Sequence, residues 1–347
     1  MDSLAVVRIF LLTTLSFVLA MLWTPALTHL LYKYRLGKGI RDAAEAPIFA
    51  SLHRKKASTP TMGGVLVWGT TLVLAGVFYY LSLLTDGIFS QLNFLSRSET
   101  LLPLGALVAS ALVGLVDDLF DAWRVGHRGG GLRVRHRLAI YGLIALVGAC
   151  WFYFKLDWTT LHIPFRGYVD IGPWYVLVFV AVIVATSFSV NETDGLDGLA
   201  GGTLLMAFAA YGAIAFAQGS YDLATFCGVL VGALLAFLWF NINPARFFMG
   251  DTGSMSLGVT LGIIALLTNA ALLLPIIGFV FVIESVSVII QLTSKKLRGK
   301  KIFLSTPIHH HLEAIGWSEP KIVMRFWVIA GVSAVVGLII FLVDLSR

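Results

Sequence analysis

VGLVDDLFD, residues 113–121, begins as an apolar membrane helix and ends with three carboxylates in five positions, those of Asp117, Asp118 and Asp121. An ionised side chain at bilayer depth costs about 2.5–3.5 kcal/mol even on the mildest insertion scales. We therefore expect a membrane helix that ends at the boundary of the bilayer, and a functional reason for its acidic end.

The composition is that of a membrane protein. The chain has 347 residues, of which 58% are hydrophobic and 13% are charged, and its mean hydropathy is +0.87. Soluble domains carry roughly 25% charged residues. The sequence thus predicts one integral membrane domain over residues 1–347. No basic segment precedes the first apolar run, so we expect that run to be retained as a first span. Cys150 and Cys227 lie in apolar runs and are expected to be buried free thiols.

A membrane-spanning helix needs about 20 apolar residues, and backbone groups inside a bilayer must bond within their own segment. These constraints predict an all-α polytopic membrane protein with about ten transmembrane helices. The eighth and ninth candidates form one apolar run, split at Asn269. The candidate spans are residues 5–31, 63–84, 101–119, 138–155, 174–190, 199–217, 223–240, 255–268, 271–293 and 322–344.

The distribution of Lys and Arg predicts the orientation, because basic residues gather in cytoplasmic loops. If the N-terminus lies outside, the inner loops hold 19 basic residues and the outer segments hold four. We therefore expect both termini outside. The net charge of +6 then reflects this bias, so no nucleic-acid partner is expected.

With this topology, six aspartates from three loops map to the cytoplasmic boundary. Two carboxylates about 4 Å apart repel by about 4 kcal/mol at an effective dielectric constant of 20, and a divalent cation removes that repulsion. Oxygen ligands without a nearby cysteine favour a hard ion, Mg²⁺ or Mn²⁺. The six residues are Asp117, Asp118, Asp121, Asp194, Asp197 and Asp251.

The adjacent aspartates are expected to divide their roles. Asp117 and Asp121 are four residues apart and share a helix face, whereas Asp118 points about 100° away. One carboxylate of the pair is therefore expected to face a metal ion, and the other a reacting group or a basic partner.

Basic and small residues near these acids are typical of phosphate binding. Arg54, Lys55 and Lys56 precede a span that opens with Gly63 and Gly64, and cations beside a helix N-terminus suit phosphate oxygens. The GDTGS segment at 250–254 offers backbone amides to an anion in the same way. Membrane anchoring is the alternative for any one of the three cations.

Two further polar features stand out. His309, His310 and His311 diverge by about 100° per residue on a helix, so they cannot chelate one ion together, and we expect one or two to donate hydrogen bonds within the site. Glu284 lies deep in the ninth span, where it is expected to be a polar packing contact or to line a groove.

Two short elements are expected between the spans. Residues 156–172 contain two β-prone runs separated at Arg166-Gly167, which favours a small hairpin. STPIHHHLEAIG, residues 305–316, favours a short helix capped by Thr306, with Pro307 at its first position and Gly316 at its end.

The motifs TPTMGG, VDDLFD, NETDGLDGLAGG, FFMGDTGS and TPIHHHLE follow one another along the chain. From about residue 30 to its end, the sequence resembles the phospho-N-acetylmuramoyl-pentapeptide transferases, a family of the polyprenyl-phosphate hexose-1-phosphate transferase superfamily. The aspartate motifs are shared by the superfamily, whereas TPTMGG and PIHHH are more specific to the muramoyl branch.

The resemblance implies a Mg²⁺-dependent reaction in peptidoglycan synthesis. Undecaprenyl phosphate attacks the β-phosphate of UDP-MurNAc-pentapeptide, UMP leaves, and lipid I remains in the bilayer. The resemblance also implies ten spans with both termini outside (periplasmic), an active site at the cytoplasmic face of the bacterial inner membrane, and a homodimer. Direct attack is favoured over a general base, because the attacking phosphate is already anionic.

The resemblance also implies roles for individual residues. It places Asp117, Asp118 and Asp251 among the catalytic residues, with Asp251 and Asp117 as Mg²⁺ ligands. The family has a lysine where Gly130 stands, and Arg128, Arg133 or Arg137 is expected to substitute for it. The family commonly has Leu in place of Glu192 and Gly in place of Ser58. Substrate binding is assigned to Lys56, Asn191, Asp194, Asp197, Phe248 (stacked on uracil), His309, His310, His311 and Arg137.

Three other functions remain as alternatives. A sister enzyme would move GlcNAc-1-phosphate from UDP-GlcNAc to a polyprenyl phosphate. A secondary transporter would also have about ten spans, but its site is expected near the bilayer midplane. An intramembrane prenyltransferase would use similar acidic motifs and would release pyrophosphate.

Overall fold

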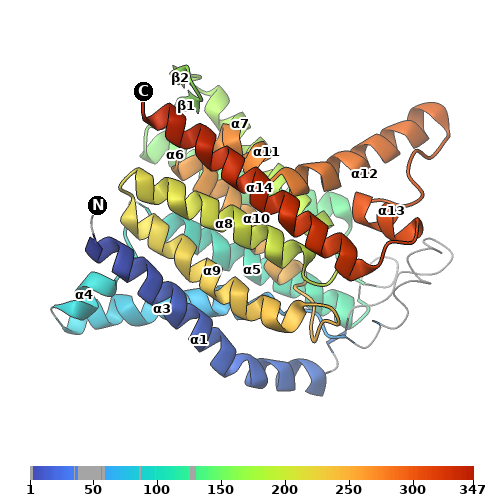
Figure 1. Cartoon of the computed structure of the whole chain (residues 1–347), viewed down its shortest axis with the longest axis horizontal. Coiled ribbons are helices and arrows are strands. Elements are labelled where there is room, and N and C mark those ends of the chain that lie inside the picture. The colour runs from blue at the N-terminus through green and yellow to red at the C-terminus, as the bar shows by residue number, and fades with distance from the viewer. Residues whose placement is uncertain are drawn as a thin grey trace.

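The computed structural model describes residues 3–34, 36–37, 56, 59–85, 87–97, 99–125 and 130–347. Arg54, Lys55, Ser58 and Arg128, which were singled out above, lie outside the described residues. The described chain is helical apart from one hairpin (Figure 1). Its elements are α1 (Ser3–Lys33), α3 (Val65–Leu84), α4 (Ile88–Leu92), α5 (Leu101–Ala122), α6 (Val134–Lys155), β1 (Thr160–Ile163), β2 (Gly167–Asp170), α7 (Trp174–Thr193), α8 (Leu199–Ala217), α9 (Tyr221–Asn241), α10 (Asp251–Leu267), the 3₁₀ helix η3 (Ala271–Leu273), α11 (Leu274–Ile277), α12 (Phe279–Arg298), α13 (Ile308–Ala314) and α14 (Glu319–Leu345).

The all-α polytopic class is confirmed. Within the described ranges, eight helices are long and apolar enough to cross a membrane, or nine if the bent pair α11 and α12 forms one span. The eight are α1, α3, α5, α6, α7, α8, α9 and α14. The span expected at 255–268 is the shorter helix α10, whose 17 residues measure about 26 Å. The expected split of the apolar run at Asn269 is confirmed, because α10 ends at Leu267 and Asn269 has a φ of 49°.

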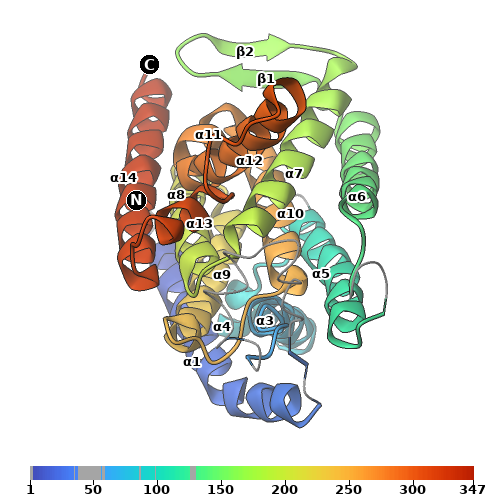
Figure 2. The same ribbon diagram turned by 90° about the vertical axis from the view of Figure 1, so that its right-hand side faces the viewer.

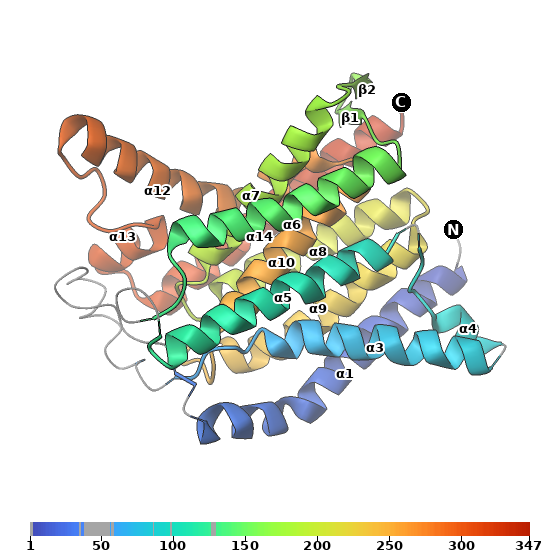
Figure 3. The same cartoon turned by 180° about the vertical axis from the view of Figure 1, so that it is seen from behind.

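The span expected over 271–293 is bent and not a single straight helix. The segment 271–277 and helix α12 meet at an angle of 83°, with Gly278 at the break, and α12 leaves the bundle (Figure 3). Helix α12 leaves the bundle because it carries a buried polar stripe with helical spacing, formed by Glu284, Ser287 and Gln291. Gln291 bonds Ile302 N, Phe303 N and Phe303 O, so α12 turns its polar face towards the following loop and its apolar face outwards.

Helix α10 is the centre of the bundle, and all of its residues but one are buried. It packs mainly against α5 and α7 (Figure 2). Small residues permit these close contacts, since a Cβ on Gly114 would strike Asp251 O and a Cβ on Gly64 would strike Gly253. The start of α10 is thereby pressed against α5 and against the start of α3.

Both chain ends lie at one end of the bundle, together with the hairpin and α4 (Figure 1). We call this the termini end, and the opposite end the site end. The expected hairpin is confirmed, with antiparallel pairs from Thr160↔Asp170 to Ile163↔Gly167. Residues 164–166 form its turn, and Gly167 opens β2 with a φ of 85°, so the turn lies slightly before the expected break.

Two contacts between a carboxylate and a basic group connect the elements at the termini end. Asp344 near the end of α14 accepts the Phe165 N–H at 2.7 Å, and its other oxygen lies 2.5 Å from His162 Nε2. The Arg8 guanidinium of α1 lies 2.5 Å from Asp222 at the start of α9. We call the contact of Asp344 with His162 the hairpin clamp.

Candidate active site

Two buried carboxylates from distant parts of the sequence meet at the site end. Asp117 at the end of α5 and Asp251 at the start of α10 are 3% and 6% exposed. Arg137 of α6 joins them, with its Nε 2.7 Å from Asp117 Oδ2 and its Nη2 2.8 Å from Asp251 Oδ2. We call Asp117 and Asp251 the carboxylate pair. One guanidinium balances part of the charge of both.

Neighbouring groups fix the orientation of this pair. Asn191 at the end of α7 donates to Asp251 Oδ1 and to Ser254 Oγ, both at 2.9 Å. Arg137 Nη1 donates to Asn191 Oδ1 at 3.5 Å, and Leu132 N donates to Asp117 Oδ1 at 2.6 Å. The ends of α5 and α7 and the starts of α6 and α10 therefore contribute to one site.

Asp118 faces away from this pair, as its position on the helix predicts. It is 3% exposed, and its two oxygens accept Asp251 N at 3.0 Å and Thr252 N at 2.9 Å. The GDTGS segment does bind an anion at a helix start, but in this structure the anion is the Asp118 carboxylate. Asp194 adds a contact to the same turn, because Gly250 N donates to its Oδ2 at 3.2 Å.

The geometry also accounts for the departure at Gly130. This residue has a φ of 149°, and a Cβ there would lie 2.6 Å from Asp121 Oδ1. A side chain at position 130 would therefore be strained and obstructed. Arg137 is the basic residue that the structure places beside the carboxylate pair.

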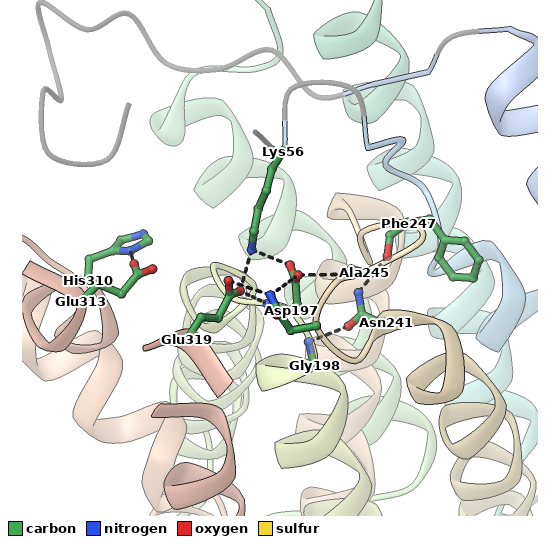
Figure 4. A network of polar contacts seen from close by, with 10 residues as sticks. Lys56, Asp197, Gly198, Asn241, Ala245, Phe247, His310, Glu313 and Glu319 are labelled. Carbon is green, nitrogen blue, oxygen red and sulfur yellow. Dashed lines mark hydrogen bonds and ion pairs between the residues drawn. The ribbon is translucent and has the colours of Figure 1, made fainter. Parts of the chain in front are cut away.

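Lys56 belongs to a second polar cluster, consisting of Lys56, Asp197, Asn243 and Glu319, which we call the lysine cluster (Figure 4). The ammonium lies 2.6 Å from both Asp197 Oδ1 and Glu319 Oε1. Asn243 Nδ2 donates to Asp197 Oδ2 at 2.9 Å and to Glu319 Oε2 at 3.0 Å. Two carboxylates again share one cation.

Phe248 lies beside this cluster. Its half-buried ring has its centroid 5.8 Å from Lys56 Nζ. Its backbone is fixed by the TPTMGG segment, because Phe248 N donates to Pro60 O at 2.8 Å and Gly63 N donates to Phe248 O at 2.7 Å. Gly63 and Gly64 therefore permit close backbone packing. The expectation that they help to bind phosphate did not include this packing.

The three histidines take different partners. His309 is fully buried, with its Nδ1 2.9 Å from Glu284 Oε2 and its Nε2 against Gly195. His310 Nδ1 lies 2.7 Å from Glu313 Oε2, and His311 Nδ1 accepts Leu304 N at 3.3 Å. The structure therefore places His309 in the packing between α12 and the α7–α8 loop. The expected packing role of Glu284 is confirmed.

The charge state of His309 follows from this setting. Burial is the largest single influence on the pKa of His309 and lowers it, but the charge and the hydrogen bond of Glu284, together with smaller contributions from other carboxylates, raise the pKa by more in sum. Glu313 and Glu192 act in the same direction, and the net pKa lies above the ordinary value of 6.5.

The short helix α13 differs from its prediction at one end. It begins at Ile308, and Pro307 is the capping residue with no side-chain hydrogen bond, so the assignment of Thr306 as the cap is wrong. Its backbone enters the helix in an extended conformation at Pro307, which puts Thr306 outside the first turn. Gly316 follows its last turn with a φ of 94°, and its expected role as the end is confirmed.

Sequence reasoning missed three polar residues that hold this region together. Glu319 and Asn243 complete the lysine cluster, and Asn241 accepts Gly198 N at 2.9 Å and donates to Phe247 O at 2.8 Å (Figure 4). A signal was present, since Asn241 and Asn243 directly follow an apolar span and Glu319 precedes one.

The oxygen donors of the site suit Mg²⁺. Among the described residues, no group of three or more His, Cys, Asp or Glu side chains is arranged to hold a metal ion alone. Mg²⁺ is nevertheless usually held by only one or two carboxylates, together with substrate phosphates and water. The carboxylate pair fits that requirement.

Comparison with known proteins identifies the family. A family model described as glycosyl transferase family 4 matches residues 100–269. The chain is 41% identical to a protein of Geobacillus sp. (strain WCH70), over 94% of this chain and 95% of that protein. It is 38% identical to a protein of Chloroflexus aggregans, over 97% and 90%, and 40% identical to one of Anoxybacillus flavithermus, over 94% and 95%. All three are named phospho-N-acetylmuramoyl-pentapeptide-transferase. The chain belongs to the phospho-N-acetylmuramoyl-pentapeptide transferase family.

Proposed function

We propose that this chain transfers phospho-MurNAc-pentapeptide from UDP-MurNAc-pentapeptide to undecaprenyl phosphate, which forms lipid I and releases UMP. The observation that carries this proposal is the carboxylate pair. Asp117 and Asp251 are 134 residues apart in the sequence, yet both contact Arg137. Family membership supplies the class of reaction, and this site supplies the groups that phosphoryl transfer needs.

The location of the site suits two substrates of different solubility. We place it at the cytoplasmic face of the bacterial inner membrane, in a single domain with ten crossings and both termini outside. This topology counts α10 and the bent pair as crossings. It is supported by the excess of basic residues in the loops of the site end and by the position of both termini at the other end (Figure 1). A soluble nucleotide sugar and a membrane-bound polyprenyl phosphate can meet only at such a boundary.

Asp117 and Asp251 are the residues that would hold Mg²⁺. When bound, this ion supplies charge neutralisation and polarisation of the diphosphate. Asn191 orients Asp251 through its amide, and Leu132 N orients Asp117. Arg137 presents a planar set of donors beside both carboxylates, and such a fork matches phosphate oxygens. It would take the place of the lysine that the family has at position 130.

The remaining residues are proposed to bind the nucleotide and its phosphates. The ring of Phe248 offers a stacking surface for uracil, and Lys56 beside it offers a cation for a phosphate. Asp194 and Asp197 fix the loop between α7 and α8 through Gly250 N and Lys56. His310 and His311 are the members of the histidine motif that retain some exposure to solvent, whereas His309 orients the others through its packing.

The reaction is proposed to proceed by direct attack. The phosphate of the acceptor lipid is anionic at neutral pH, so it needs positioning and screening of charge more than removal of a proton. Arg137 and Lys56 supply positive charge near the reacting groups.

A release assay tests the proposed function. Purified protein is incubated with a polyprenyl phosphate and UDP-MurNAc-pentapeptide, with and without Mg²⁺, and UMP is measured. UMP release that depends on Mg²⁺ and on the lipid is expected. UMP release with UDP-GlcNAc instead would establish the sister activity, and solute uptake by proteoliposomes without UMP release would establish a transporter. Light scattering of the solubilised protein tests the homodimer that belongs to the same proposal.

A further inference from the structure

The two adjacent aspartates at the end of α5 have separate surroundings. Asp117 faces the Arg137 guanidinium and Leu132 N. The oxygens of Asp118 are instead occupied by two backbone amides, those of Asp251 and Thr252, which are the first two residues of α10. Asp118 therefore caps a helix to which it does not belong.

This cap is needed because α10 has none of its own. The residue before the helix is Gly250, which has no side chain to accept the amides of the first turn. A carboxylate at a helix N-terminus is favoured by the helix dipole and forms charge-assisted hydrogen bonds. A Cβ on Gly250 would lie 2.6 Å from Asp118 Oδ2, so the missing side chain leaves room for Asp118.

Further bonds hold the same turn. Thr252 Oγ1 donates to Ala111 O of α5 at 2.9 Å, and Gly114 of α5 packs directly against the Asp251 backbone. Helix α5 is therefore bonded to the first turn of α10 at Asp251 N, Thr252 N and Thr252 Oγ1. The direction of the Asp251 side chain depends on that turn.

We propose that Asp118 is a positioning residue. It fixes the first turn of α10 and thereby aims the Asp251 carboxylate at the site, and it contacts neither substrate nor metal. This inference rests on the proposed function, in which Asp251 and Asp117 face the substrate. It replaces a direct catalytic role for Asp118 with an indirect one, and it gives the paired aspartates different chemistry.

Asp118→Asn tests the inference, with Asp117→Asn as the matched control. The amide of asparagine places an N–H₂ donor against one of the two backbone N–H donors, so one cap bond is lost and the charge is removed. Amide hydrogen exchange of the full-length protein, read by mass spectrometry over residues 250–256, should be at least about tenfold faster in Asp118→Asn and unchanged in Asp117→Asn.

Kinetic measurements distinguish a positioning role of Asp118 from direct contact of Asp118 with the substrate. A misplacement of about 1 Å costs on the order of 10²-fold in rate, so UMP release by Asp118→Asn should fall by about that factor while the KM for UDP-MurNAc-pentapeptide stays within about threefold. Loss of activity with unchanged exchange at the start of α10 would overturn the inference, and so would full activity despite faster exchange.

A second variant, Thr252→Val, tests the same inference independently of whether Asp118→Asn folds. Thr252→Val keeps the volume of the side chain and removes its bond to Ala111 O, together with the bond that its hydroxyl accepts from Trp68 Nε1 at 3.1 Å. It should accelerate exchange over the same residues and lower the rate of UMP release by a smaller factor, about 3- to 10-fold. Wild-type exchange and wild-type turnover in Thr252→Val would contradict the inference. If the wild-type protein releases no UMP, the proposed function fails, while the exchange measurements still report on the cap.

Discussion

Charged groups are arranged differently at the two ends of this bundle. At the termini end they pair one to one, as in the hairpin clamp of His162 and Asp344 and the contact between Arg8 and Asp222. Each contact joins two elements through one carboxylate and one basic group. These contacts account for the attachment of the hairpin and of α1, and no further function is needed to explain them.

At the site end, pairs of carboxylates share single cations. Arg137 serves Asp117 and Asp251, and Lys56 serves Asp197 and Glu319. Buried carboxylates in excess over cations repel one another, and a ligand that brings positive charge relieves the repulsion. The ratio of carboxylates to cations, rather than the number of ion pairs, thus distinguishes the site from a purely structural contact.

The largest effect is expected for Asp251→Ala. This change removes one member of the carboxylate pair and one of the two acceptors of the Asn191 amide, so UMP release should fall by about 10³-fold or more. The helix content measured by circular dichroism should stay unchanged, because the Asp251 backbone still donates to Asp118. Turnover at the wild-type rate would show that the excess carboxylates are structural. The ratio of carboxylates to cations would then not mark the site.

Arg137→Gln should have the next largest effect. It leaves two buried carboxylates without their common cation, so we expect about 10²-fold slower UMP release and a lower midpoint of thermal unfolding. Arg135→Gln, which alters an exposed arginine of the same helix, is the matched control and should retain the wild-type rate. Equal rates in the two variants would remove Arg137 from the site.

Glu284→Gln should reduce stability in a way that depends on pH. The pKa of His309 is raised by Glu284 in the folded protein, so the stabilisation from the pair is fully present below the unfolded pKa of about 6.5 and is lost as the pH rises through the folded value. Replacing Glu284 should cost about 2 kcal/mol in acid. The unfolding midpoints of the two proteins, measured by intrinsic fluorescence across pH, should converge at alkaline pH. A difference that grows with pH would contradict this prediction.

The smallest effect is expected at the termini end. Asp344→Asn weakens the hairpin clamp, which is partly exposed, and should cost ~1 kcal/mol or less. The rate of UMP release should stay within about twofold of the wild type. A loss of activity as large as that of Arg137→Gln, in a variant that remains folded, would show that the termini end also serves the reaction.

Hydropathy and turn chemistry predicted much of the fold from the sequence, since the eight long spans, the hairpin and the end of α13 at Gly316 depend on local patterns. The break at Gly278 was not predicted, because average hydropathy overlooks that Glu284, Ser287 and Gln291 share one face of α12. Their spacing of three and four residues was visible in the sequence.

The sequence predicted which residues belong to the site better than it predicted what each of these residues contacts. Loop position and charge predicted that Asp117 and Asp251 would gather at one boundary. The partners of Asp118 and Lys56 were not predictable, because they come from residues more than 100 positions away and are chosen by the packing of helices. The spacing within a motif indicates the direction of a side chain, but the neighbouring helix decides what it contacts.

The guanidinium shared by Asp117 and Asp251 has a consequence for how the protein is made. Because this counter-ion belongs to the chain itself, we expect insertion into the bilayer and assembly of the bundle not to require divalent ions. A chelator should therefore stop UMP release without unfolding the protein. Adding the ion back should restore UMP release within the time of mixing. Folding and the proposed activation by Mg²⁺ are therefore expected to be two separate events.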